Sequence, residues 1–301
     1  MHHLIPHNPT AGMICLSEDG GSLGELEREF LLSCVSEHGY VILRGFKADI
    51  GEFSRLVRSV SKRISLDPAR SFNGDVAQKV DAGYDAVGLH CENGNSPFWP
   101  NLCWFYCEQS PSRGSQTTVC DGYAVFADME PDARQLFSGQ DIMYSRNVAS
   151  KHWKTYVLHA LSNQDGDAPR SIDEIELKHL LSLIDDPTAA TVFENSDGSI
   201  SYHFQVSAVR QSVLSKKSAP AFANSIFGPS YNYEKPLITL ADGAAIPDQL
   251  LEALGAVCDQ HTYDVGWKDH DVLLIDNTRV MHGRRPIDDK ARVIYNALSY
   301  S

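Results

Sequence analysis

Residues 87–107 read VGLHCENGNSPFWPNLCWFYC and place His90 and Glu92 two positions apart, just before a long apolar run. In a β-strand, side chains two residues apart point to the same face, so a strand here would aim an imidazole and a carboxylate at one point. Such a pair suits a metal ion, an acid/base pair or a hydrogen bond at the rim of a sheet. With 12 histidines and 39 acidic residues in 301 positions, the spacing arises by chance about once or twice, so the pair needs partners.

Two further candidates lie near the end of the chain. In VLLIDNTRVMHGRRP, residues 272–286, an apolar run precedes His282, which by itself is typical of a turn residue. Arg292 opens the strand-like stretch RVIYNALSY, residues 292–300. A guanidinium that faces inward is costly to bury unless an anion pairs with it, so Arg292 indicates either a bound carboxylate or an ordinary ion pair.

These residues explain one another when they are taken together. Two histidines and one carboxylate occupy one face of an octahedral Fe(II) and leave three positions open. An α-keto acid would fill two of these positions, and its distal carboxylate would need a fixed arginine. Dioxygen would take the third position.

Composition limits the class of protein. A length of 301 residues allows one large domain or two ordinary ones, and an apolar fraction of 43% is enough for a full core. The net charge of −13 argues against nucleic acid and anionic membrane surfaces as partners. No apolar run reaches the length of a membrane span. The seven cysteines form no CxxC pair, and the first residues do not resemble a signal peptide, so a cytoplasmic, reducing setting is expected.

Local patterns predict many short strands and a few helices. Helices are expected over 22–38, 49–64, 171–184 and 246–265, the third opened by a capping box of Ser171 and Glu174. Strands are expected at 40–43, 101–107, 115–122, 200–209, 271–277 and 291–300. Residues 65–86 are expected to form a loop or lid over the site, and residues 160–200 a helical insert. These elements favour one β-rich domain, a sandwich or barrel with outer helices.

Four motifs in fixed order carry a family resemblance: HCE (90–92), GSQTTVCDG (114–122), WKDHDVLLIDNTRVMHGRRP (267–286) and ARVIYNALSY (291–300). Together they resemble the Fe(II)/2-oxoglutarate-dependent oxygenases, and most of all the taurine dioxygenase and clavaminate synthase superfamily. The resemblance runs from about residue 39 to the C-terminus. It implies a mainly β fold with flanking helices, built as a single domain over 1–301 on a double-stranded β-helix, or jelly-roll, core.

The resemblance also implies roles for particular residues. His90, Glu92 and His282 would be the iron ligands, and Arg292 would form a salt bridge with the distal carboxylate of 2-oxoglutarate. Thr117 matches the family threonine whose hydroxyl bonds the co-substrate. The implied cofactors are Fe(II), 2-oxoglutarate and O2.

Two departures from taurine dioxygenase bear on the substrate. Glu92 stands where aspartate is commoner, which resembles clavaminate synthase and the amino-acid hydroxylases near it, and its presence disfavours halogenation. Asn296 stands where taurine dioxygenase has an arginine that grips a sulfonate, so a sulfonate substrate is disfavoured. The expected substrate is an amino acid or an amino-acid-derived intermediate of secondary metabolism. The candidate substrate contacts are Phe72, Phe98, Trp99 and Asn296, with Arg284 and Arg285 as candidate carboxylate partners or surface ion pairs.

The leading interpretation is therefore a dioxygenase that hydroxylates a C–H bond of a small molecule, although the same cofactors also support desaturation or cyclisation. A zinc hydrolase would use the same His90, Glu92 and His282, but it leaves Thr117 and Arg292 unexplained. A non-catalytic jelly-roll binding protein is the third interpretation. The sequence leaves a homo-oligomer open.

Overall fold

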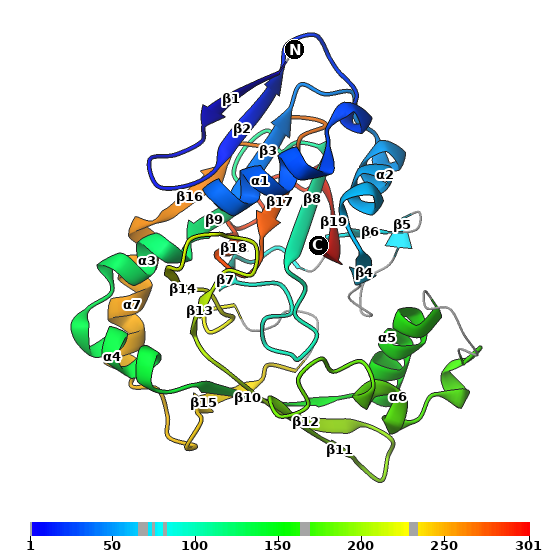
Figure 1. The fold of residues 1–301 in the computed structure, drawn as a ribbon, viewed down its shortest axis with the longest axis vertical. Helices are drawn as coiled ribbons and strands as arrows, with labels where there is room; N and C mark the ends of the chain where they lie inside the picture. Colours follow the sequence, from blue (N-terminus) through cyan, green and yellow to red (C-terminus); the bar gives the residue numbers. More distant parts are fainter. Residues whose placement is uncertain (1, 66–71, 74–75, 81–82, 163–168, 229–233) are drawn as a thin grey trace.

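A large sheet, which lies in the upper half of the view in Figure 1, supplies one wall of an apolar core. The computed structural model describes residues 2–65, 72–73, 76–80, 83–162, 169–228 and 234–301. The strands pair in the order β1-β2-β3-β17-β8-β19-β6-β5, and β4 also pairs with β19. Only the β2–β3 pair among them is parallel. Their bounds are β1 (His2–Pro6), β2 (Met13–Ser17), β3 (Tyr40–Arg44), β4 (Arg63–Ser65), β5 (Phe72–Asn73), β6 (Ala77–Lys79), β8 (Leu102–Gln109), β17 (Val272–Asp276) and β19 (Val293–Tyr300).

A smaller, antiparallel sheet supplies the other wall. Its strand order is β16 (Thr262–Val265), β9 (Thr117–Asp121), β18 (Val280–Arg284) and β7 (Val87–His90). Val119, Val265 and Val280 of this sheet share one buried cluster with alternate residues of β3, β8, β17 and β19. The two sheets therefore face each other across an apolar core.

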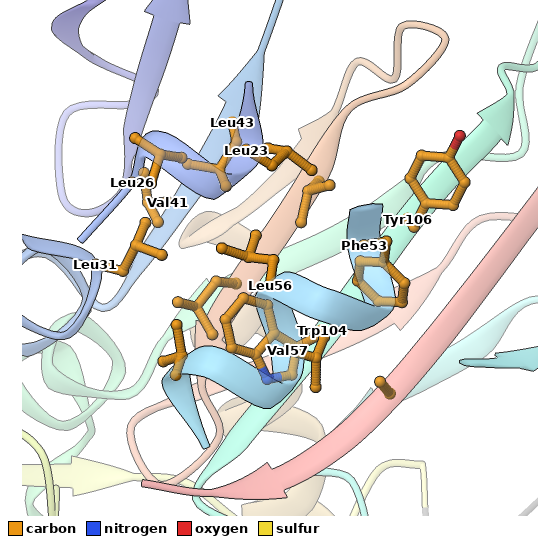
Figure 2. Packing of buried hydrophobic residues seen from close by; sticks show 14 of the residues in the cluster. Leu23, Leu26, Leu31, Val41, Leu43, Phe53, Leu56, Val57, Trp104 and Tyr106 are labelled. Atoms are coloured by element: carbon orange, nitrogen blue, oxygen red, sulfur yellow. The ribbon is translucent and has the colours of Figure 1, made fainter. Parts of the chain in front are cut away.

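Strand β8 shows how both faces of the large sheet are covered. Its first six residues are all buried because Cys103, Phe105 and Cys107 join the core between the sheets, whereas the residues that alternate with them face outward. On the outer side, the Tyr106 ring stacks on Phe53 with 5.5 Å between ring centroids. Figure 2 shows this outer layer, in which Leu56 and Val57 of helix α2 lie beside Trp104.

Two helices cover that outer face. Helix α1 (Arg28–His38) ends at Gly39, whose φ of +85° suits glycine and whose position leaves no room for a Cβ beside Val280. A short 3-10 helix, η1 (Leu23–Glu25), precedes it. Helix α2 (Ile50–Val60) begins after Asp49, whose carboxylate accepts a 2.7 Å hydrogen bond from the Glu52 amide.

A third sheet packs beneath the small sheet (Figure 1). Its order is β11 (Ala190–Glu194), β12 (Ile200–Val206), β10 (Ile142–Val148) and β15 (Leu237–Leu240). Helices α3 (Gly122–Asp128), α4 (Pro131–Gly139) and α7 (Asp248–Gln260) complete the same apolar cluster. Helices α5 (Ser150–Ser162) and α6 (Leu177–Leu181) form a separate cluster on β12, and β13 (Val209–Gln211) pairs with β14 (Pro220–Phe222).

The mainly β architecture with flanking helices agrees with the sequence, but several local predictions were wrong. The segment 65–86 contains β5 and β6 and is not simply a loop, while 66–71, 74–75 and 81–82 lie outside the described residues. The described part of the segment 160–200 is only partly helical, because residues Ala190–Glu194 form strand β11. The capping box is formed by Glu176 and His179, and the Ser171 side chain makes no cap hydrogen bond. Across the described ranges, no helix has the length and apolar character needed to cross a bilayer.

Candidate metal centre

The two histidines meet because their strands pair. In the β7–β18 ladder His90 stands directly opposite His282, and residues that face each other across an antiparallel pair project to the same side. Their ring centroids are 4.4 Å apart. His282 is buried, and its ring makes a T-shaped contact with Phe105 of the large sheet, at 5.1 Å between ring centroids. Both imidazoles therefore project into the space between the sheets.

Glu92 joins them from a turn. Strand β7 ends at His90, so Glu92 follows the strand and does not belong to it, contrary to the geometry from which the pair was first inferred. Its Oε2 lies 3.2 Å from His282 Nε2 and 3.6 Å from His90 Nε2. One ligand atom from each of the three residues lies within 4.8 Å of the others. We call this set the triad.

A buried asparagine fixes the Glu92 backbone. Asn277 accepts a 2.8 Å hydrogen bond from the Glu92 amide and donates to the carbonyls of Glu92 and Pro100, at 2.9 and 2.7 Å. The indole of Trp99 donates to the Asn277 carbonyl at 3.0 Å. Sequence reasoning missed Asn277, and the only local sign of it was a polar pair at the end of the apolar run VLLI.

Close backbone packing sets the position of His90. The Nδ1 of His90 lies 2.9 Å from the carbonyl of Gly88, which fits an Nδ1–H donor and leaves Nε2 as the metal-binding nitrogen. A Cβ on Gly88 would come within 2.2 Å of the Phe227 carbonyl oxygen. A Cβ on Gly228 would come within 2.2 Å of the Gly88 carbonyl oxygen and 3.0 Å of the His90 ring. Both glycines are required by this approach.

The triad fits a metal ion by its donor set. Two imidazole nitrogens and one carboxylate oxygen converge from one side, which is the facial arrangement of non-haem Fe(II) oxygenases. Neutral imidazole suits iron, and the carboxylate supplies negative charge. A closed structural zinc site would need a fourth protein ligand, and the triad is the metal-binding cluster found in the described ranges.

The two residues expected at the co-substrate are both buried. Thr117 begins β9, and Val119 two residues later stands opposite His282 in the β9–β18 pair. Thr117, Val119 and His282 therefore project from the same face of the sheet. Its hydroxyl accepts a 3.1 Å hydrogen bond from the Trp267 indole. Arg292 is 9% exposed, and within the described residues its Nε has no hydrogen-bond partner. Burial and the nearby Arg284 guanidinium lower the pKa of Arg292 to about 10.

Asn296, which was expected to contact the substrate, lies between β8 and β6 and is buried. It stands opposite Phe105 in the β19–β8 ladder, and Phe105 is the residue that packs on His282. Asn296 is fully buried, and in the described part of the chain neither its Oδ1 nor its Nδ2 has a hydrogen-bond partner. Gln78 of β6 stands opposite Asn296 on the other side and is also buried. Sequence reasoning missed Gln78, because its segment was expected to be a loop.

The other candidates have different surroundings. Phe98 packs on Tyr156 of α5, at 4.7 Å between ring centroids, whereas the Trp99 ring lies under the Arg210 guanidinium at 4.2 Å. The side chain of Phe72 lies outside the described residues.

The two arginines after His282 also differ from each other. Arg284 is buried and donates to the carbonyls of Gly83 and Asp85, at 3.2 and 2.8 Å. Arg285 pairs with Asp264 at 2.9 Å on the surface, as one of its two interpretations predicted.

Known proteins resemble this chain over most of its length. A clavaminate synthase-like protein of Arabidopsis thaliana is 24% identical over 288 residues, which cover 89% of this chain and 84% of that protein. The dapdiamide synthesis protein DdaC of Enterobacter agglomerans is 23% identical and covers 96% and 91%. The crystal structure of PvcB from Pseudomonas aeruginosa matches 99% of this chain and 91% of its own with a TM-score of 0.64 at 14% identity.

These similarities agree with the two facing sheets, so the predicted double-stranded β-helix core is confirmed. The family model described as taurine catabolism dioxygenase TauD, TfdA family, matches residues 11–298. That match includes the triad, Thr117, Arg292 and Asn296. The chain therefore belongs to the TauD/TfdA family of Fe(II)- and 2-oxoglutarate-dependent dioxygenases.

Proposed function

We propose that this chain oxidises, and most simply hydroxylates, a C–H bond of a small amino-acid-derived molecule, with His90, Glu92 and His282 holding the iron. The convergence of these three side chains at the end of the β7–β18 pair is the observation that carries the proposal. Iron, together with 2-oxoglutarate and dioxygen, supplies the oxidising power that an unactivated C–H bond requires. The side chains of the protein would bind and orient the co-substrate and the substrate, and they would exclude water from the site.

Arg292 and Thr117 would hold the co-substrate. A buried guanidinium without a carboxylate partner among the described residues is costly, and the distal carboxylate of 2-oxoglutarate would neutralise it through two parallel hydrogen bonds. Thr117 faces the same side as His282, so its hydroxyl is suited to a second contact with that carboxylate. A zinc hydrolase has no use for either residue.

Asn296 would contact the substrate, with Phe98 and Trp99 as candidates nearer the surface. The side-chain amide of Asn296 is neutral: it offers one hydrogen-bond acceptor and two donor hydrogens, and it carries no charge that could bind a sulfonate. The names of two relatives agree with a biosynthetic role on small molecules. DdaC is a dapdiamide synthesis protein, and a PvcB structure is described as an Fe, alpha-ketoglutarate dependent oxygenase from an isonitrile synthetic pathway.

The whole chain would act as one domain in a reducing, cytoplasmic setting. The family match spans residues 11–298, which supports a single oxygenase domain over 1–301. All seven cysteines are free and buried, so none depends on an oxidising compartment.

The decisive experiment follows metal and co-substrate together. Purified protein should release succinate from 2-oxoglutarate only when Fe(II) is present, and under argon Fe(II) with 2-oxoglutarate should give a visible charge-transfer band. His90→Ala and His282→Ala should abolish both signals, because each removes a ligand from the site. His270→Ala is the matched control, since His270 contacts Tyr106 away from the triad, and it should keep both. Iron binding and succinate release that survive in the two triad variants would refute the assignment.

A further inference from the structure

Two buried amides interrupt the apolar inward face of the large sheet. Asn296 of β19 stands opposite Gln78 of β6, so both side chains project from the same face. That face is the inward one, because Ile294 and Leu298, two residues to either side of Asn296, belong to the core between the sheets. Asn296 is 0% exposed and Gln78 is 1% exposed. Fully buried polar side chains in an apolar layer call for a physical explanation.

The two amides lie in a row that leads to the metal ligands. On the other side of Asn296, strand β8 places Phe105 directly opposite it. The Phe105 ring contacts the ring of His282, at 5.1 Å between ring centroids. Phe105, Asn296 and Gln78 therefore form one row across β8, β19 and β6, on the face that meets the triad. A group bound over Asn296 is thus one strand away from the residue that packs against a metal ligand.

The side-chain amide of Asn296 makes no hydrogen bond. Within the described ranges neither its Oδ1 nor its Nδ2 has a partner, so Gln78, directly opposite, does not bond it. Asn224 shows what a buried asparagine usually does: it is equally buried, donates to the Ala208 carbonyl at 3.1 Å and accepts from the Ile226 amide at 3.0 Å. An unpaired buried amide destabilises the free protein, and a ligand that pairs with it removes this cost. The unpaired amide of Asn296 therefore points to a bound molecule.

The surroundings of Asn296 define the group that it can bind. Its Oδ1 accepts and its Nδ2 donates, which matches a carboxamide through two antiparallel N–H···O hydrogen bonds. Its neighbours in the row are a phenyl ring and a neutral amide, neither of which carries a charge. Arg292 lies four residues earlier in the chain, roughly 13 Å away along an extended strand. A carboxylate, sulfonate or ammonium group over Asn296 would therefore be buried without a counter-charge.

We propose that Asn296 and Gln78 are the specificity-determining residues of the substrate site, and that they select a substrate with an uncharged carboxamide. Asn296 bonds the carboxamide through both of its polar atoms, and Gln78 adds a hydrogen bond from β6. The inference rests on the proposed function and narrows its substrate class. It excludes substrates whose group at this position is a carboxylate, a sulfonate or an ammonium.

The first test measures the cost of the unpaired amide in the protein without ligand. Asn296→Leu replaces the amide by an apolar group of similar shape, so the melting temperature of the ligand-free protein should rise by a few degrees. Asn224→Leu is the matched control, and it should lower the melting temperature because it removes the hydrogen bonds of Asn224. An Asn296→Leu protein that melts below the wild type overturns the proposal, because the amide would then stabilise the fold itself.

The second test uses three probes of nearly one shape: butyramide, 2-pentanone and butyrate. Each is titrated into wild-type protein loaded with Mn(II), a paramagnetic substitute for Fe(II), and saturating 2-oxoglutarate. The relaxation of the probe protons reports binding beside the metal. Butyramide should bind roughly fivefold more tightly than 2-pentanone, which lacks a donor, and roughly tenfold more tightly than butyrate, which carries a charge. Equal affinities, or no probe bound beside the metal, overturn the proposal.

Variants assign the preference to the two amides. Asn296→Leu should abolish the preference for butyramide over 2-pentanone, and Gln78→Met should reduce it. Gln205→Met is the matched control for Gln78, since Gln205 of β12 bonds Asp141 on the third sheet, and it should keep the full preference. An undiminished preference in Asn296→Leu overturns the proposal, and the same result in Gln78→Met overturns the role of Gln78.

Failure of this inference is separable from failure of the proposed function. Equal probe affinities in a protein that still binds Mn(II) and 2-oxoglutarate reject the carboxamide site alone. Absence of metal and co-substrate binding rejects the oxygenase roles of the triad, Thr117 and Arg292.

Discussion

Arg292 carries a positive charge on a buried side chain, where the charged form is destabilised by loss of solvation. Burial lowers its pKa to about 10, and Arg284 adds like-charge repulsion. If 2-oxoglutarate supplies the missing anion, Arg292→Ala removes a charge-assisted pair that contributes on the order of 2–5 kcal/mol. The affinity of the protein for 2-oxoglutarate should therefore fall about 30- to 3000-fold. Arg292→Lys should recover part of the loss, since lysine keeps the charge and loses the fork.

The measurement for Arg292 is a titration of the charge-transfer band with 2-oxoglutarate under argon. Iron affinity serves as the internal control. Arg292 is not a metal ligand, so Arg292→Ala should leave the affinity for iron nearly unchanged. Thr117→Ala should show the smaller loss of an ordinary hydrogen bond, about 1 kcal/mol. Wild-type affinity for 2-oxoglutarate in Arg292→Ala would remove Arg292 from the co-substrate site.

Asn277 acts on the metal through the backbone of Glu92. Asn277→Ala leaves the Glu92 amide and two carbonyls without their partner, so the Glu92 turn should shift and iron affinity should fall by roughly 10- to 100-fold. Asn101→Ala is the matched control, because Asn101 makes a similar pair of hydrogen bonds to Ser301 and none to Glu92. Iron titration of both variants decides the matter. Equal iron affinities would mean that Asn277 only stabilises the fold.

At the level of elements, the backbone of Phe227 and Gly228 packs against Gly88 of strand β7 so closely that a side chain at position 88 would not fit. Gly88→Ala would place a methyl group against the Phe227 carbonyl and displace β7, with His90, from its position in the β7–β18 pair. We expect a loss of roughly 1–3 kcal/mol in stability together with weaker iron binding. Gly139→Ala, where an added Cβ meets nothing within 4 Å, should be neutral or slightly stabilising. Thermal melts and iron titrations of both variants would test this, and a Gly88→Ala protein as stable as wild type would contradict it.

The elements also show what the sequence could and could not predict. Apolar runs such as VLLI and WFYC predicted buried strands correctly, since period and β-branching act locally. The helix expected over 246–265 stops at Gln260, and TYDV pairs with β9, because β-rich residues beside an available strand edge favour pairing. The local helix signal contained no information about that edge.

The site divides in the same way. The triad, Thr117 and Arg292 could be proposed from the sequence because their order and spacing match a family. Asn277 and Gln78 could not, since each depends on a pairing between distant parts of the chain: Asn277 bonds Glu92 across 185 positions, and Gln78 faces Asn296 across the β6–β19 ladder. The position of Glu92 in a turn was missed for the same reason, as the end of β7 is set by its partner β18.

At the scale of the whole molecule, the free energy of unfolding depends on pH, because five buried thiols have raised pKa values in the folded chain. Burial is the main cause for Cys15, Cys34 and Cys107, whose pKa values rise from 9.0 to about 12, 11 and 12. The pKa of Cys91 and Cys258 also rises. Between pH 8 and 10 the unfolded chain loses these protons and the folded chain keeps them, so stability is fully present below about pH 9 and falls as the pH rises.

The expected loss is up to about 1.4 kcal/mol for each such thiol by pH 10, where an unfolded thiol of pKa 9 is mostly ionised. Denaturation midpoints in urea at pH 7, 8, 9 and 10 would measure it. Arg292, whose pKa is lowered, acts in the opposite direction only above about pH 10. Buried tyrosines such as Tyr40 and Tyr106, whose pKa is raised from 10.0, act in the same direction as the thiols near pH 10, so the change up to about pH 9 is the part due to the thiols. Cys107→Ala should be less stable at pH 7 yet lose less stability between pH 8 and 10, because one titrating group is gone. A thiol reagent at pH 8 should react with all seven cysteines only after unfolding. Rapid reaction of the native protein, or midpoints that do not change with pH, would show that the core exposes its thiols to solvent.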